Sequence, residues 1–138
     1  MFLSNLDPKA LRLGLATFLG LYVLHLLVLP LLVGTEGDSK ESSGTLYAIH
    51  QFLGLATCLV AGFVAGRIAG TKGFLHGGVI GAVGTLLTAL GAMLWSVVTG
   101  AKFLGLGTIP FWIMVNGFLT AFGGFIATNT ADSSDDNF

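Results

Sequence analysis

Long apolar runs separated by short polar segments dominate the pattern of the chain. Four of these runs are long enough to cross a bilayer as helices, since roughly 20 apolar residues span about 30 Å of hydrocarbon. The spans are expected at about residues 11–33, 46–68, 74–98 and 109–127. Charged side chains lie between the runs or near their ends. The pattern therefore predicts an all-α integral membrane four-helix bundle with up-down topology, a single domain over residues 1–128.

The polar segments predict where these helices begin and end. Asp7 followed by Pro8 is typical of an N-cap with proline in the first helical turn. Residues 34–44 read GTEGDSKESSG and are expected to form a solvated loop. Residues 70–73 are too few for anything but a tight turn between antiparallel helices. Residues 129–138 are acidic and polar, so they are expected to form a flexible tail.

Glycines recur at every third or fourth position of the apolar runs, which places them on one face of each helix. In lipid, such faces let another backbone approach closely. We expect the stripe of the second span to pack against the stripe of the third. The alternative is that the stripe of the third span faces another subunit. The predicted helix-packing positions are Gly54, Gly62, Gly66, Gly70, Gly73, Gly77, Gly81, Gly84 and Gly91.

The composition agrees with a membrane protein and excludes one class of partner. Of the 138 residues, 54% are hydrophobic and 9% are charged, against roughly 25% charged in an average soluble domain. The net charge is -1 and no basic block is present, so nothing favours nucleic acid as a partner. The single cysteine, Cys58, cannot form a disulfide within the chain.

Lysine and arginine are unevenly divided between the two predicted sides of the membrane. Four of them lie on the side of the N-terminal segment and the 70–73 turn, and two lie on the other side. This bias predicts that both termini are cytoplasmic. Arg67 and Lys72 flank the tight turn and are expected to be lipid anchors. The four residues on the inner side are Lys9, Arg12, Arg67 and Lys72.

Few polar groups lie inside the spans, and three of them have similar predicted depths. At 1.5 Å per residue, His25 and Asn116 are roughly 12 Å deep and His50 roughly 6 Å. We expect these three side chains to form a hydrogen-bonded cluster between helices. The alternative is a b-type haem with His25 and His50 as axial ligands. His76 lies at the inner interface, where a solvated or headgroup contact is expected.

The sequence predicts function mainly by exclusion. No acidic or basic residue lies deep in a span, whereas ion-coupled transporters and proton pumps depend on such residues. No nucleophile and base pair, phosphate loop or metal motif is present, so no enzyme activity, catalytic residue or metal site is predicted. The expected function is that of a non-enzymatic packing or accessory subunit, or a homo-oligomer, in a membrane complex. The alternatives are a small channel or carrier with a pore between protomers, and a haem-binding electron-transfer subunit.

The segment around the tight turn resembles a known family. The turn reads GFVAGRIAGTKGFLHGGVIG from Gly62 to Gly81, and the last span ends GGFIATN at Gly123 to Asn129. Both are similar to the YrzE-like family of small four-span bacterial membrane proteins. The resemblance implies the fold, the topology and a place in the inner (cytoplasmic) membrane of a bacterium. It implies no activity, because that family has no settled one. The positions that carry it at the turn are Gly66, Arg67, Ala69, Gly70, Lys72, Gly73, Phe74, Leu75, His76, Gly77 and Gly78.

Overall fold

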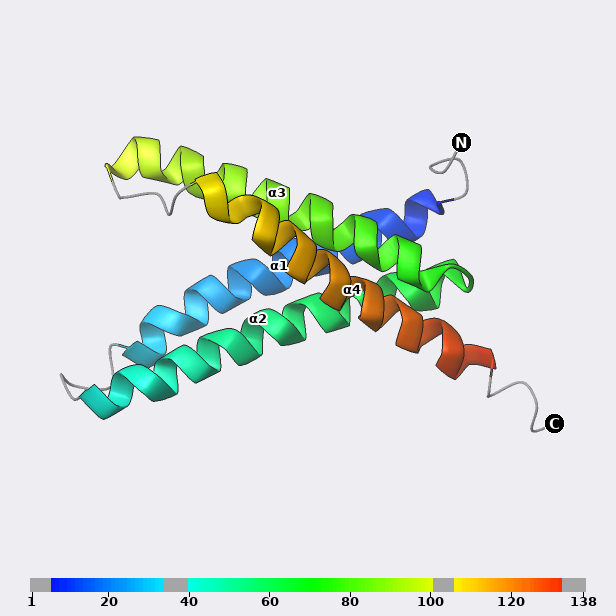
Figure 1. Ribbon diagram of the computed structural model, residues 1–138, viewed down its shortest axis with the longest axis horizontal. Helices are drawn as coiled ribbons and strands as arrows, with labels where there is room; N and C mark the ends of the chain where they lie inside the picture. Colours follow the sequence, from blue (N-terminus) through cyan, green and yellow to red (C-terminus); the bar gives the residue numbers. More distant parts are fainter. Residues whose placement is uncertain (1–5, 34–39, 101–105, 133–138) are drawn as a thin grey trace.

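A computed structural model describes residues 6–33, 40–100 and 106–132, and nearly all of them are helical (Figure 1). Each of the four long helices contains a stretch that is long and apolar enough to cross a membrane. This result confirms the predicted all-α fold and the antiparallel order of its helices. The helices are α1 (Pro8–Val33), α2 (Lys40–Ala69), α3 (Gly73–Thr99) and α4 (Ile109–Asp132), and the short 3-10 helix η2 (Leu106–Thr108) precedes α4.

Two helices extend further than the hydrophobic pattern predicts. α2 begins at Lys40, inside the predicted loop over residues 34–44, and α4 continues to Asp132, inside the predicted tail. Extending a helix that is already formed costs little per residue, so it can pass beyond the apolar run into polar sequence. Residues 34–39 of the predicted loop and residues 133–138 of the predicted tail lie outside the described part of the chain.

The first helix begins as its sequence predicts. The side-chain carboxylate of Asp7 accepts a hydrogen bond from the backbone N–H of Lys9 at 2.8 Å. The backbone carbonyl of Asp7 accepts another from the N–H of Leu11 at 3.1 Å. Pro8 occupies the first helical position, where its missing N–H leaves no bond unmade. The N-cap prediction for Asp7 is therefore confirmed.

The turn between α2 and α3 is as tight as predicted, and it depends on two left-handed residues. Gly70 has φ 64° and Lys72 has φ 52°. Glycine adopts this conformation without steric cost, whereas lysine is penalised by about 1–2 kcal/mol. The carbonyl of Lys72 accepts hydrogen bonds from the N–H groups of Leu75 and His76 at 3.0 and 3.2 Å. These bonds begin α3 and hold Lys72 in its unusual conformation.

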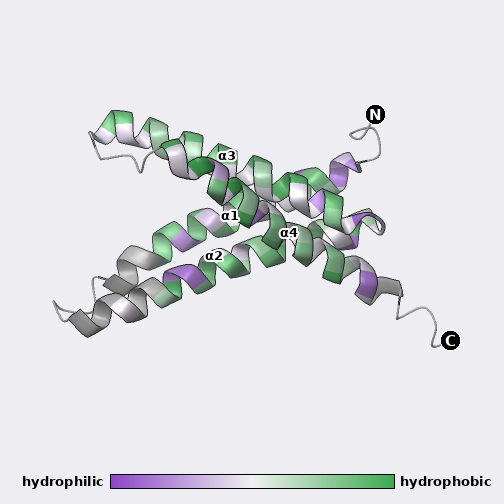
Figure 2. Cartoon of the chain, viewed as in Figure 1, coloured by the Kyte–Doolittle hydropathy of each residue, from purple (hydrophilic) through white to green (hydrophobic). Residues whose placement is uncertain are grey.

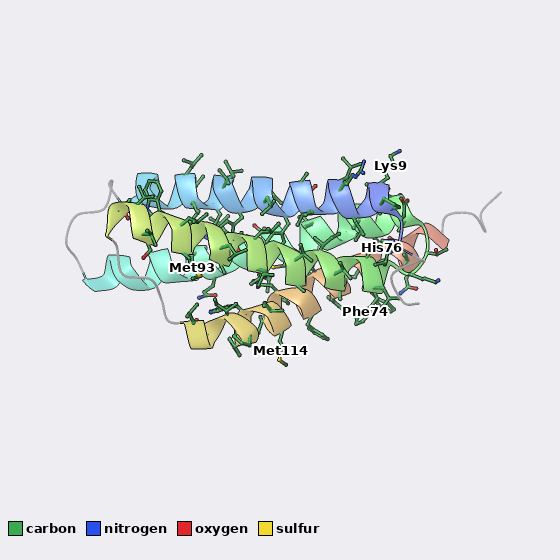
Figure 3. The ribbon with its side chains drawn as sticks, turned by 90° about the horizontal axis from the view of Figure 1, so that it is seen from above. Lys9, Phe74, His76, Met93 and Met114 are labelled. Atoms are coloured by element: carbon green, nitrogen blue, oxygen red, sulfur yellow. The ribbon has the colours of Figure 1, made fainter. Side chains whose placement is uncertain are left out.

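The hairpin formed by α2 and α3 lies between the other two helices. α4 packs on both α2 and α3, and α1 packs on the same two helices, whereas α1 and α4 do not contact each other over the described residues. Figure 3 shows this order, with α1 on one side and α4 on the other. α1 and α4 therefore pack on different faces of the hairpin.

The core occupies only the half of the bundle that adjoins the α2–α3 turn, which we call the packed half. Every buried residue of α3 lies between Gly73 and Thr85. Beyond this region the α1–α2 pair and the α3–α4 pair move apart (Figure 1), and we call this part the splayed half. Much of α3 is hydrophobic there as well (Figure 2). Leu94, Trp95 and Val97 of α3 are 69%, 67% and 83% exposed.

Cysteine labelling tests the predicted orientation. The first turn of α1 and the α2–α3 turn lie at the same end of the molecule (Figure 1), so four basic residues share that side. In a Cys58→Ala background, a Ser39→Cys variant is expected to react with an impermeant thiol reagent added outside the cell. A Thr71→Cys variant should react only after the membrane is permeabilised. The reverse pattern would overturn the cytoplasmic placement of the termini.

Candidate functional site

The closest helix contacts in the molecule are made by glycines that face α4. A Cβ atom added at Gly62 of α2 would meet the backbone of Thr120 and Gly124, and one added at Gly66 would meet Gly124 and Ala127. The same holds for α3, where Cβ atoms at Gly73, Gly77 and Gly81 would meet the α4 backbone at Gly124, at Thr120 and Ala121, and at Asn116.

The predicted pairing of the two glycine stripes is therefore wrong. Both stripes pack against α4 and not against each other. The physical reason is that two small-residue faces side by side form a shallow trough, which a third helix with small residues of its own can occupy. α4 supplies Gly123 and Gly124, and a Cβ at Gly124 would meet the backbone of both Gly73 and Gly62. Sequence reasoning missed these two positions, although Gly123 and Gly124 are adjacent in the sequence.

The remaining predicted packing positions have other surroundings. Gly84 contacts the aromatic ring of Phe18 on α1. At Gly54, Gly70 and Gly91 an added Cβ would meet nothing within 4 Å, so these three do not serve helix packing in the described part of the chain. Gly70 is instead needed for the left-handed turn, where a residue with a Cβ would be strained.

The small apolar core lies where α1 packs on the hairpin, and Leu119 of α4 also packs against it. Phe18 of α1 packs with Cys58, Ala61 and Ala65 of α2 and with Ile80 of α3. Small residues on α2 admit the large Phe18 ring, and this interdigitation fixes the position of α1 along the hairpin. Gly14 of α1, which the glycine spacing does not single out, adjoins this core, because a Cβ atom there would meet Ile80 and Ala65.

The structure brings two of the three predicted polar residues together. The Nε2 of His25 lies 2.7 Å from the Nδ1 of His50, and Tyr22 contacts the His25 ring edge-on. A haem iron held between two such nitrogens needs about 2 Å to each of them, as metal–imidazole bonds generally do. A directly hydrogen-bonded pair leaves no room for it. Haem ligation by these two residues would require the rings to separate.

The third residue of the predicted cluster lies elsewhere. The side-chain amide N–H of Asn116 donates to the hydroxyl of Thr85 at 3.0 Å. The side-chain oxygen of Asn116 accepts a hydrogen bond from the thiol of Cys58 at 3.5 Å. Asn116 therefore joins α4 to α2 and α3. It does not meet His25 because α4 and α1 are on opposite sides of the hairpin, where equal depth in the membrane does not bring side chains together.

A third histidine has a role that the sequence does not suggest. His76 is 2% exposed, in contrast to the predicted solvated or headgroup position. Its Nε2 accepts a hydrogen bond from the backbone N–H of Asp7 at 2.8 Å, and its Nδ1 lies 3.0 Å from the Lys72 carbonyl. These two partners imply a neutral ring with the proton on Nδ1. His76 therefore ties the start of α1 to the α2–α3 turn (Figure 3).

The basic residues at the turn have the exposure that lipid anchors need. Arg67 lies in the last turn of α2, and both Arg67 and Lys72 are exposed at the end of the packed half. Lys9 and Arg12 are exposed near the same end, on the first turns of α1. The anchoring role of Arg67 and Lys72 stays a prediction.

Comparison of the chain with protein-family models, with curated proteins and with solved structures finds no match. A function for this chain therefore has to be inferred from the geometry of its described residues.

Proposed function

We propose that this protein is a non-enzymatic membrane subunit that works by assembling with other membrane helices, as a homo-oligomer or as an accessory subunit of a larger complex. The observation that carries the proposal is the contrast between the two halves of the bundle. The packed half uses its glycines to hold α4, whereas the splayed half has glycines that contact nothing in the described chain. Small-residue positions of this kind commonly serve contacts between separate helices in lipid.

Two of these positions are suited to such a contact. Gly54 on α2 and Gly91 on α3 belong to the glycine stripes, yet each lies beyond the reach of α4. Near Gly91 the side chains of Leu90 and Leu94 are about half or more exposed. We expect a partner helix to approach the backbone at Gly91 beside these leucines, as α4 approaches the backbone at Gly81.

A channel or carrier is the weaker of the candidate functions. Its predicted pore would be lined by His25, His50 and Asn116, but Asn116 is separated from the histidine pair by the α2–α3 hairpin. In addition, the hydroxyl groups of Thr57 and Thr120 donate to carbonyls of their own helices, so they are already engaged. We propose no cofactor for the assembly role. We also propose that the protein lies in the bacterial inner membrane and is related to the YrzE-like family. The basic residues at the turn support both points.

Substitution at Gly91 tests the assembly. We expect Gly91→Leu to reduce crosslinking to the partner in membranes by about tenfold, because overpacking a tight interface costs about 1–3 kcal/mol. The melting temperature of the monomer in detergent should not change, since Cβ at this position meets nothing within the chain. Ala92→Leu is the control, because Ala92 is also exposed but on a different face of α3.

The assembly state of the wild-type protein tests the proposal directly. If it purifies from native membranes as a lone monomer in mild detergent, and no partner is crosslinked in cells, the assembly role is wrong. Equal crosslinking by Gly91→Leu and Ala92→Leu would remove Gly91 from the interface and leave Gly54 as the position to test.

A further inference from the structure

A groove with a volume of about 190 Å³ runs between α1 and α2. It lies within the membrane-spanning parts of both helices, which are Pro8–Val28 and Ala48–Ala69. Its occupant must therefore be soluble in hydrocarbon. Most of the lining side chains are aliphatic, and the residues are Leu21, Leu24, His25 and Val28 from α1, and Leu53, Ala56, Thr57 and Val60 from α2.

His25, which lines this groove, has one buried polar atom without a partner among the described residues. His25 is 5% exposed, and its Nδ1 makes no hydrogen bond in the described part of the chain. His76 shows what the same atom does elsewhere in the molecule, because its Nδ1 reaches the carbonyl four residues earlier. A buried polar atom without a partner costs about 1–3 kcal/mol, and such atoms are rare in native proteins. The Nδ1 of His25 therefore indicates a missing ligand atom.

The ligand atom has to suit either protonation state of this nitrogen. One proton lies between the Nε2 of His25 and the Nδ1 of His50, which are 2.7 Å apart. If His50 donates this proton, the Nδ1 of neutral His25 carries an N–H and needs an acceptor. If His25 donates it, the same Nδ1 is bare and needs a donor. The two requirements correspond to the two tautomers of neutral His25, and passing from one to the other changes the tautomer of both rings.

Water is a poor candidate for this place. An ordered buried water needs two to four polar partners. Among the lining residues that the structure describes, Thr57 is the one besides His25 with a polar side chain, and its hydroxyl already donates to the carbonyl of Leu53 at 2.9 Å. An acyl chain of a phospholipid would fill the volume, but it would leave the Nδ1 of His25 unpaired.

We propose that the groove binds the head group of a lipid-soluble quinone. A cavity of about 150 Å³ accommodates a benzene molecule, so this groove is large enough for one substituted six-membered ring. The quinone carbonyl accepts a hydrogen bond from a protonated Nδ1 of His25, and the hydroxyl of the reduced form donates to a bare Nδ1. The aliphatic side chains of Leu24, Val28 and Leu53 contact the ring and the start of its hydrocarbon tail.

Binding of a matched pair of probes tests this proposal. The first probe is a benzoquinone with a decyl chain, and the second is decylbenzene, which has a similar shape but no oxygen. The protein in detergent is expected to retain the quinone about tenfold more tightly than decylbenzene, as one buried hydrogen bond provides. Retention is measured against empty micelles. The test uses the monomer, so its outcome does not depend on the proposed assembly.

Three variants assign the preference to the groove. His25→Phe should abolish the preference for the quinone, and Ala56→Leu should weaken both probes by filling the groove. Val23→Leu is the control, because Val23 is 55% exposed and does not line the groove. Equal retention of the two probes by the wild-type protein would show an apolar filler only and overturn the proposal. So would a quinone preference that survives both His25→Phe and Ala56→Leu.

Discussion

Replacing Gly124 with leucine is expected to destabilise the bundle by at least about 3 kcal/mol, the upper end of typical overpacking costs. Gly124 is the point at which α4 meets both α2 and α3. A Cβ atom there would meet the backbone of Gly73 on α3 and of Gly62 on α2. Backbone atoms cannot rotate away as side chains do, so α4 has to move away from Gly73 to admit the new side chain. In mild detergent the melting temperature should fall by on the order of 10 °C.

A leucine elsewhere provides the control for this effect. At Gly20 of α1 an added Cβ would meet nothing within 4 Å, so Gly20→Leu should melt within a few degrees of the wild type. A smaller substitution that grades the response is Gly78→Ala, since Cβ there would make an ordinary contact with Ala121 at 3.7 Å. If Gly124→Leu and Gly20→Leu have the same melting temperature, the packing of α4 does not depend on close backbone contact.

The glycine positions show how far spacing along a sequence predicts packing. A period of three or four residues identifies the small face of one helix, and Gly62, Gly66, Gly77 and Gly81 do lie at close contacts. The same period carries no information about which helix covers that face. The choice of α4 follows from the complementary small residues around Gly124, and recognising it requires all helices to be compared in three dimensions.

The polar residues show a similar division. Depth in the membrane follows from counting residues along a span, and it correctly predicts that His25 and His50 can meet, because their helices are neighbours. Depth alone also places Asn116 with them. The lateral arrangement puts α1 and α4 on opposite faces of the hairpin, and neither the length nor the composition of the spans determines this arrangement.

Long-range contacts to the backbone are the least visible in the sequence. His76 and Asp7 are separated by 69 positions, and the acceptor that satisfies the Asp7 N–H is a ring nitrogen on another helix. The local pattern predicts Asp7 as an N-cap, which is confirmed. The local sequence does not show that the Asp7 N–H, which lies before the helix, also has a hydrogen-bond acceptor. The tie depends on α1 starting beside the α2–α3 turn.

Replacement of His76 tests this tie, and three substitutions separate its two hydrogen bonds. His76→Leu removes both and should destabilise the protein by about 1–3 kcal/mol, because the partly buried Asp7 N–H loses its acceptor. His76→Gln places an acceptor near the position of Nε2 and should retain the bond to the Asp7 N–H. His76→Asn reaches only the position of Nδ1 and should retain the bond to the Lys72 carbonyl. The measurements are melting temperature in detergent and amide hydrogen exchange of the first turn of α1.

The order of the variants in hydrogen exchange distinguishes a held N–H from a merely buried one. Exchange at Asp7 should rise at least about tenfold in His76→Leu and His76→Asn, because a bond worth about 1.4 kcal/mol changes an equilibrium tenfold. His76→Gln should stay close to the wild type at this amide. The amides of the first turn of α4, which is far from His76, serve as the internal control. If Gln and Asn leave the Asp7 amide equally protected, the N–H is shielded by burial alone, and His76 does not hold the start of α1.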